Sequence, residues 1–278
     1  MTILSLTIII FLGSLLAGFL GSLTGLGGGF IIIPMLTLML GIDIRYAIGA
    51  SLVAVIATSS GAAAAYVREG ITNIRMGMFL EIATTLGAIT GAFLAVYIPT
   101  YIIAIVFGCI LIFSALNTLL KKNATPLPVE SSPLAEKLKL NGSYPTKEGV
   151  ISYNVKNVPG GFLMMGLAGI LSGLLGVGSG AFKVLAMDGI MKIPFKVSTT
   201  TSNFMIGVTA AASAGIYLQR GYIDPGLCMP VTLGVLGGAV IGSFALTKMQ
   251  TKKLRTVFAF VIMAVAFQML YNGITKKI

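Results

Sequence analysis

The sequence predicts an all-α integral membrane protein built from two homologous halves. Hydrophobic residues make up 56% of the 278 residues and charged residues only 10%, whereas a soluble domain usually carries about 25% charged residues. The mean hydropathy is +0.98. A glycine-rich segment of the first half returns 151 residues later in similar apolar surroundings. We therefore expect a multi-pass protein of the cell membrane, embedded in the lipid bilayer.

Apolar runs long enough to cross the hydrocarbon layer, which takes about 20 residues, occur four times in each half. They are residues 3 to 23, 46 to 67, 76 to 98, 101 to 120, 160 to 175, 197 to 218, 226 to 247 and 254 to 273. Two shorter runs, 29 to 41 and 180 to 192, are helix-like but marginal for a full crossing. Each half is thus expected to have four to five transmembrane helices.

The internal repeat keeps one register over most of a half-chain. Gly25 falls on Gly176, and further along Ser51 falls on Ser202 at the same offset. A repeat of this length is typical of transporters made from two related halves. The predicted organisation is a first transmembrane repeat over 1–120, a linker over 121–158 and a second transmembrane repeat over 159–278.

Loop charges indicate how the halves are oriented. The linker contains six lysines, and basic loops favour the cytoplasmic side. Residues 248 to 255 are strongly basic, whereas their first-half counterpart, 97 to 104, carries no charge. This opposite bias predicts an inverted-topology repeat with both termini outside. Lys276 and Lys277 argue against it, and the repeat would be parallel if the two short runs are re-entrant.

The composition excludes several classes of chemistry. Histidine is absent, and the two cysteines, Cys109 and Cys228, lack the spacing of metal ligands. We therefore expect no metal site and no cofactor. The net charge of +11 comes from basic residues in short loops between spans, so orientation explains it better than nucleic-acid binding does. The two glycine clusters, residues 25–29 and 176–180, do not match a nucleotide-binding motif.

The two glycine clusters are interpreted as helix breaks inside the membrane. A helix that restarts there directs free N–H groups and partial positive charge at its surroundings. Irregular backbone is tolerated at that depth only where it lines a cavity or is buried in protein. This favours an anion site at which the two helix starts face each other. The candidate substrate-binding residues are Gly25, Gly27, Gly28, Gly29, Gly176, Gly178, Ser179 and Gly180.

Other small residues have a structural interpretation. The pairs Gly87/Gly91 and Gly238/Gly242 have the small-xxx-small spacing that suits close helix packing. For these four glycines we expect packing and no ligand.

Ionisable residues inside the predicted spans are Glu81, Lys183 and Asp188, and such residues are costly enough to suggest function. Lys183 follows the second cluster, so it is the best candidate to pair with a substrate anion. The alternative is that Lys183 extends to the membrane interface or pairs with Asp188. Glu81 and Asp188 are candidates for ion coupling, although Glu81 also fits a place near the cytoplasmic end of its helix, close to Arg75.

Hydroxyl and amide groups supply further hydrogen-bond donors. Most serine and threonine side chains in helices bond to their own carbonyls. Ser51, Ser202 and Asn203 are expected to be the exceptions that contact substrate. The halves are unequal here, because Ile32 and Leu52 stand where the second half has Lys183 and Asn203.

Motifs in both halves resemble the TauE/SafE family of membrane permeases, which is associated with export or uptake of sulfite and organosulfur anions. In the first half they are Gly25-Leu26-Gly27-Gly28-Gly29-Phe30-Ile31-Ile32-Ile33-Pro34, Gly49-Ala50-Ser51-Leu52 and Arg68-Glu69-Gly70-Ile71. In the second half they are Gly173-Leu174-Leu175-Gly176-Val177-Gly178-Ser179-Gly180-Ala181-Phe182-Lys183, Thr199-Thr200-Thr201-Ser202-Asn203-Phe204-Met205 and Arg220-Gly221. The resemblance covers nearly the whole chain except the linker. Ser179, where a third adjacent glycine is usual, and the long linker depart from the pattern.

These observations predict a secondary transporter that moves a small anion, such as sulfite, thiosulfate or an organosulfonate, by alternating access. No ATP-binding motif is present, so the driving force is expected to be the substrate gradient or a coupling ion, H+ or Na+. The alternatives are an anion channel, or a transporter of a carboxylate or another small solute. A membrane-embedded enzyme is not supported, because no catalytic constellation is found. The sequence leaves the oligomeric state open.

Overall fold

The computed structural model describes residues 3–24, 28–120, 130–146, 149–246 and 251–277. Within these ranges the chain is mainly helical, with several long apolar helices, which confirms the predicted class of an all-α membrane protein.

The first half consists of five helical segments. They are α1 (Ile3–Thr24), α2 (Gly29–Pro34) continuing as the π-helix η1 (Met35–Met39), α3 (Ile44–Arg68), α4 (Ile74–Tyr97) and α5 (Thr100–Leu120). A helix rises about 1.5 Å per residue, so α2 and η1 together reach about 16 Å, roughly half of the hydrocarbon thickness.

The second half repeats this order of elements. They are α7 (Val158–Leu175), α8 (Gly180–Val184) continuing as the π-helix η2 (Leu185–Ile190), α9 (Phe195–Gln219), α10 (Pro225–Leu246) and α11 (Thr251–Ile274). The bounds of α9 are those of α3 displaced by 151 residues, and α8 begins 151 residues after α2. Element boundaries therefore follow the register of the sequence repeat.

Each predicted apolar run falls largely on a helix within the described residues. Three helices, α3, α4 and α7, are long and apolar enough to cross a membrane in their described residues. Shorter apolar stretches lie in α1, α2 with η1, α5, α10 and α11. Helix α9 is as long as α3 but is rich in hydroxyl side chains. The number of crossings stays a prediction.

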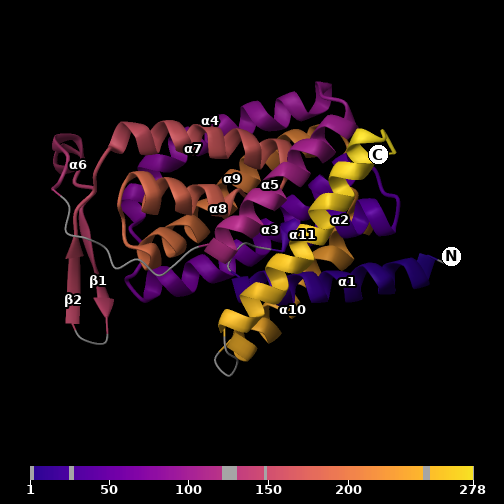
Figure 1. Cartoon of the computed structure of the whole chain (residues 1–278), viewed down its shortest axis with the longest axis horizontal. Coiled ribbons are helices and arrows are strands. Elements are labelled where there is room, and N and C mark those ends of the chain that lie inside the picture. The colour runs from indigo at the N-terminus through magenta and orange to yellow at the C-terminus, as the bar shows by residue number, and fades with distance from the viewer. Residues whose placement is uncertain (1–2, 25–27, 121–129, 147–148, 247–250, 278) are drawn as a thin grey trace.

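Two helix pairs pack closely along glycines, α4 with α7 and α1 with α10 (Figure 1). A Cβ atom on Gly87 or Gly91 would collide with the carbonyl oxygen of Gly166 or Ile170 on α7. A Cβ on Gly238 would collide with the carbonyl of Leu15 on α1. The packing role predicted for these three glycines is confirmed. The surroundings of Gly242 lie outside the described part of the chain.

Helices α3 and α9 pack against each other, as do α5 and α11. The short segments lie beside the central helices, α2 against α3 and α8 against α9. The glycine clusters that begin these segments are thereby placed next to the two longest helices of the protein.

The linker forms a small folded unit, which the sequence interpretation did not predict. It contains α6 (Pro133–Lys137) and an antiparallel hairpin of β1 (Gly142–Thr146) and β2 (Gly149–Tyr153), in which Gly142 lies opposite Tyr153. Leu140 and Val155 are fully or almost fully buried against apolar residues of α4 and η2. In Figure 1 this unit lies at one end of the molecule and both termini lie at the other.

Candidate functional site

The second glycine cluster interrupts the helical backbone as predicted. Helix α7 ends at Leu175, and Gly176 and Gly178 then take left-handed conformations, with φ of 65° and 72°. Ser179 is also left-handed (φ 47°) and precedes the start of α8 at Gly180. In the first half α2 begins at Gly29, directly after Gly28. Gly25 and Gly27 lie outside the described residues.

The two clusters touch each other. A Cβ atom on Gly29 would lie 3.3 Å from the Cα of Val177 and 2.7 Å from the hydroxyl oxygen of Ser51. Ser51 donates a hydrogen bond of 2.9 Å to the carbonyl of Gly176. Glycine is required at residue 29 because the neighbouring chain approaches so closely. In this conformation no room is left for an anion between Gly29 and Val177.

The other polar candidates have different surroundings. Ser202 is buried and its hydroxyl lies 3.3 Å from the carbonyl of Gly180, to which it donates. Each serine of the repeat-equivalent pair thus bonds to the second cluster. Asn203 is only partly buried, and its side chain has no hydrogen bond within the described part of the chain.

Lys183 is completely buried, with an exposed fraction of 0%. Its ammonium group donates a hydrogen bond of 2.5 Å to the hydroxyl of Thr209 on α9. The same ammonium lies 4.0 Å from Oε2 of Glu81 on α4. The alternative in which Lys183 extends to the membrane interface is wrong, because α4, α8 and α9 enclose it. Asp188 lies further along, half-buried in η2.

Glu81 is buried as well, with an exposed fraction of 7%. Its Oε1 accepts hydrogen bonds from Thr209 (2.6 Å) and from Thr85 (3.1 Å). Its Oε2 has no hydrogen-bond partner among the described residues. Tertiary contacts bring α9 over the Glu81 side chain and enclose it. Its place near the cytoplasmic end of α4 stays a prediction.

Thr209 joins the two charges, and the sequence interpretation missed this role. Its hydroxyl accepts from Lys183 and lies within hydrogen-bond distance of Glu81. The only signal in the sequence was that Thr209 repeats Thr58, and Thr58 bonds only to carbonyls of its own helix. Identical residues in the two halves thus have different partners.

The charged cluster has no charged counterpart at the positions related to it by the repeat. At the repeat offset of 151 residues, Glu81 corresponds to Thr232, Thr209 to Thr58 and Lys183 to Ile32. The corresponding set is neutral, and Ile32 is fully buried. Of the two sets of residues that the repeat relates, only one therefore contains a positive and a negative charge together.

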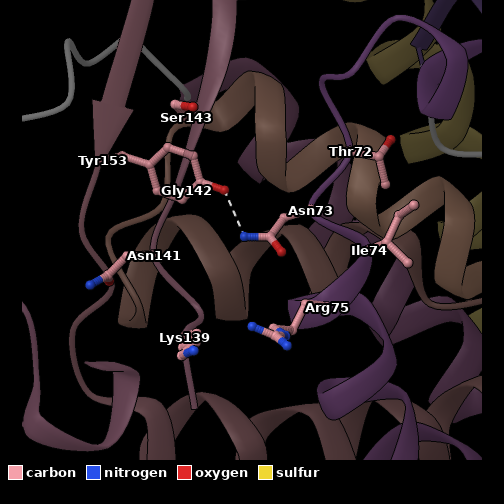
Figure 2. Close-up of a pocket in the computed structure, with 9 residues that line it drawn as sticks. All are labelled: Thr72, Asn73, Ile74, Arg75, Lys139, Asn141, Gly142, Ser143 and Tyr153. Atoms are coloured by element: carbon pink, nitrogen blue, oxygen red, sulfur yellow. Dashed lines mark hydrogen bonds between the residues drawn. The ribbon is translucent and has the colours of Figure 1, made fainter. Parts of the chain in front are cut away.

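An open pocket of about 430 Å³ lies away from the charged cluster, where the linker unit meets the turn before α4 (Figure 2). Asn73 connects three parts of the chain there: its backbone N–H donates to Thr201 of α9, and its side-chain amide donates to Leu140 and to the Tyr153 hydroxyl. Burial raises the pKa of that hydroxyl, and the hydrogen bond from Asn73 partly opposes the shift. The lining residues are Thr72, Asn73, Ile74, Arg75, Lys139, Asn141, Gly142, Ser143 and Tyr153.

Comparison with known sequences adds to this geometry. The profile described as Sulfite exporter TauE/SafE matches residues 10–269. The chain is 27% identical over 278 residues to the probable membrane transporter protein YunE of Bacillus subtilis (strain 168), covering 98% of this chain and 99% of that protein. The probable membrane transporter protein YdhB of the same organism is 28% identical over 238 residues, covering 85% and 87%. The probable membrane transporter protein MJ0441 of Methanocaldococcus jannaschii is 23% identical over 276 residues, covering 94% and 93%. No solved structure matches the chain significantly.

Proposed function

Because the chain belongs to the sulfite exporter TauE/SafE family, we propose that it is a secondary transporter of a small oxyanion that works by alternating access. The substrate class includes sulfite, thiosulfate and organosulfonates. Membrane transport follows from the family and from relatives named as membrane transporters. The choice of an anion depends on the site.

The observation that carries the proposal is the buried ammonium of Lys183. A lysine held inside a membrane protein costs about 3 kcal/mol or more unless it is paired. Its nearest carboxylate oxygen is 4.0 Å away, longer than a direct charged hydrogen bond of about 2.8 Å. An oxyanion that reached Lys183 would supply closer and stronger contacts. Lys183 is therefore the proposed charge partner of the substrate.

The remaining candidate residues surround this charge in the proposal. The Ser179 hydroxyl is buried without a hydrogen-bond partner among the described residues, so it is available to a ligand. The backbone of the cluster formed by Gly176, Gly178 and Gly180 and the side chain of Asn203 provide further donors. Ser202 would become a donor to substrate by releasing its bond to Gly180. On the other half the proposed residues are Gly25, Gly27, Gly28, Gly29 and Ser51. Because Gly29 touches Val177 here, substrate would have to enter when these clusters separate.

An inverted repeat supplies the movement that alternating access needs. Three features support it. Helices α2, α3 and α4 begin 151 residues before α8, α9 and α10, respectively. Helix α1 packs against α10, and their repeat equivalents, α7 and α4, pack against each other. This exchange of partners is expected when a two-fold axis relates the two halves. The termini lie at the end opposite the linker unit, as an odd number of crossings in each half requires (Figure 1).

The proposal is tested by binding and by flux. Purified protein is heated with sulfite, thiosulfate, sulfoacetate, taurine and simple carboxylates, and the anion that raises the melting temperature is used in proteoliposomes. We expect saturable flux in the wild type and none in Lys183→Ala. The matched control is Lys196→Ala, because Lys196 is exposed on α9. Wild-type flux from Lys183→Ala would refute the assigned site, and flux that does not saturate would indicate a channel.

A further inference from the structure

The buried pair of Glu81 and Lys183 is electrically neutral as it stands. One carboxylate and one ammonium face each other across 4.0 Å with the Thr209 hydroxyl between them. They come from different halves of the chain, Glu81 from α4 and Lys183 from α8. A movement of one half against the other would therefore change the distance between the charges.

One atom of this pair is left without a partner. Both hydrogen bonds to Glu81 go to Oε1, whereas Oε2 is buried and has no donor among the described residues. A buried acceptor without a donor costs about 1 to 3 kcal/mol, and more when it is charged. Oε2 is therefore the atom at which a proton would be best accommodated.

The elements that pack against α4 bring few other charges to this point. Helix α7 carries no charged residue. On α9 the only charged side chain is Lys196, which is exposed, and Tyr217 donates its hydroxyl hydrogen to the carbonyl of Gly173. On α4 itself Arg75 is exposed at the first turn. Lys183 is thus the charge that faces Glu81.

We propose that Glu81 couples transport to protons, so that one proton crosses with each anion in the same direction. This inference rests on the proposed transport function. Binding a monovalent anion at Lys183 would leave the buried site with one net negative charge. A proton taken from the same aqueous side forms an O–H bond at Oε2 of Glu81 and returns the net charge to zero. On the other side that O–H bond breaks, the anion leaves, and Glu81 again balances Lys183.

A proton fits this site better than Na+ does. Sodium would need several oxygen ligands in addition to Oε2 of Glu81. The ammonium of Lys183 would also repel a cation placed at Glu81. A proton needs only one carboxylate oxygen.

The experiment uses proteoliposomes with a pH-sensitive dye inside and the membrane potential clamped. The probes are labelled methanesulfonate, which is monovalent, and labelled thiosulfate, which is divalent. Both stay ionised over the physiological pH range, so neither anion carries the proton itself. We expect an acidic outside to accelerate uptake several-fold, with about one proton entering per methanesulfonate, as the charge balance of a buried site requires. Glu81→Gln is expected to keep exchange of labelled anion but to lose both proton entry and acceleration by acid.

Controls separate a loss of coupling from a loss of structure. Glu136→Gln changes an exposed glutamate of the linker unit and should behave as the wild type. Thr209→Val keeps both charges but removes the hydroxyl between them, so acceleration by acid should weaken. Its repeat-equivalent, Thr58→Val, removes a hydroxyl bonded only within α3 and should leave acceleration unchanged. These threonine variants test the inference even if Glu81→Gln fails to fold.

The outcomes distinguish the two proposals. If flux depends on Lys183 but no proton enters, or if Glu81→Gln still responds to acid as the wild type does, proton coupling by Glu81 is refuted and the transport function stands. If neither anion shows flux that depends on Lys183, the proposed function fails and the coupling inference fails with it.

Discussion

At the scale of single residues, the proposed function depends on a pair of opposite charges that are far apart in the sequence and adjacent in the fold. Taking two charges out of water is costly, and the cost is offset only when each has the other and its hydrogen bonds. Lys183, Glu81 and Thr209 meet this condition only in part, through contacts between α8, α4 and α9, because Oε2 of Glu81 has no donor among the described residues. Removing one charge should therefore lower the stability of the protein more than removing both charges does.

We predict this non-additivity for the thermal stability of the purified protein. Lys183→Met leaves Glu81 charged and unpaired, which typically costs about 3 to 5 kcal/mol for a buried pair. The double variant Lys183→Met with Glu81→Gln should recover a large part of that loss. Melting temperatures of the two single variants and the double variant measure the coupling. For the exposed residues Lys196 and Glu136, the same substitutions should be additive. Additivity at the buried pair would show that the two charges do not interact.

At the scale of elements, helices pack where glycines let two backbones approach. Gly169 and Gly173 of α7 interleave with Gly87 and Gly91 of α4. Lipid surrounds a membrane helix with apolar contacts in either state, so close packing stabilises this pair more than the hydrophobic effect does. The glycines facing the partner helix should tolerate substitution much less than those facing away.

Helix α7 offers a matched pair of positions for this prediction. A Cβ on Gly173 would meet the backbone nitrogen of Ala92 at 2.7 Å, whereas a Cβ on Gly166 would meet nothing within 4 Å. Gly173→Ala should lower stability by about 1 to 3 kcal/mol through overpacking. Gly166→Ala should be neutral or raise stability by up to about 1 kcal/mol, because alanine favours the helix. Equal melting temperatures for the two variants would contradict the packing of α4 on α7.

At the scale of the whole molecule, the linker unit is bound to the transmembrane helices by hydrogen bonds. The Asn73 side chain donates to Leu140 and to Tyr153, while its backbone N–H bonds to Thr201 of α9. Its amide oxygen also accepts from the backbone of Met76 at the start of α4. A single side chain thus connects the linker to the helix that carries Glu81.

Loss of this side chain should loosen the linker unit. In Asn73→Ala we expect faster hydrogen exchange of residues 130 to 156, because the two side-chain bonds to the unit are lost. Each neutral hydrogen bond contributes about 1 kcal/mol, so a several-fold change in exchange is expected. Arg75→Ala, which removes an exposed side chain two residues further along, is the control. Unchanged protection of residues 130 to 156 in Asn73→Ala would mean that other contacts hold the unit.

The proposed inverted repeat makes a prediction about the sides of the membrane. Ser143→Cys lies in the linker hairpin and Thr275→Cys lies near the C-terminus, in a protein whose native cysteines, Cys109 and Cys228, are replaced by alanine. In intact cells an impermeant thiol reagent should label residue 275 and leave residue 143 unlabelled until the cells are opened. Labelling of both positions from the same side would favour a parallel repeat.

The sequence by itself determined the helical membrane class, the common register of the two halves and the helix break at the second glycine cluster. These features depend on local composition and spacing, so they can be derived without knowing which helices meet. The sequence also identified Lys183, Glu81 and Asp188 as the costly charges, but it did not connect Lys183 with Glu81. Only the tertiary structure decided that they share Thr209, because the packing of α4, α8 and α9 brings together residues that lie 102 and 128 positions from Glu81. The folded linker was missed for the same reason, since its buried residues gain their apolar surroundings from α4 and η2.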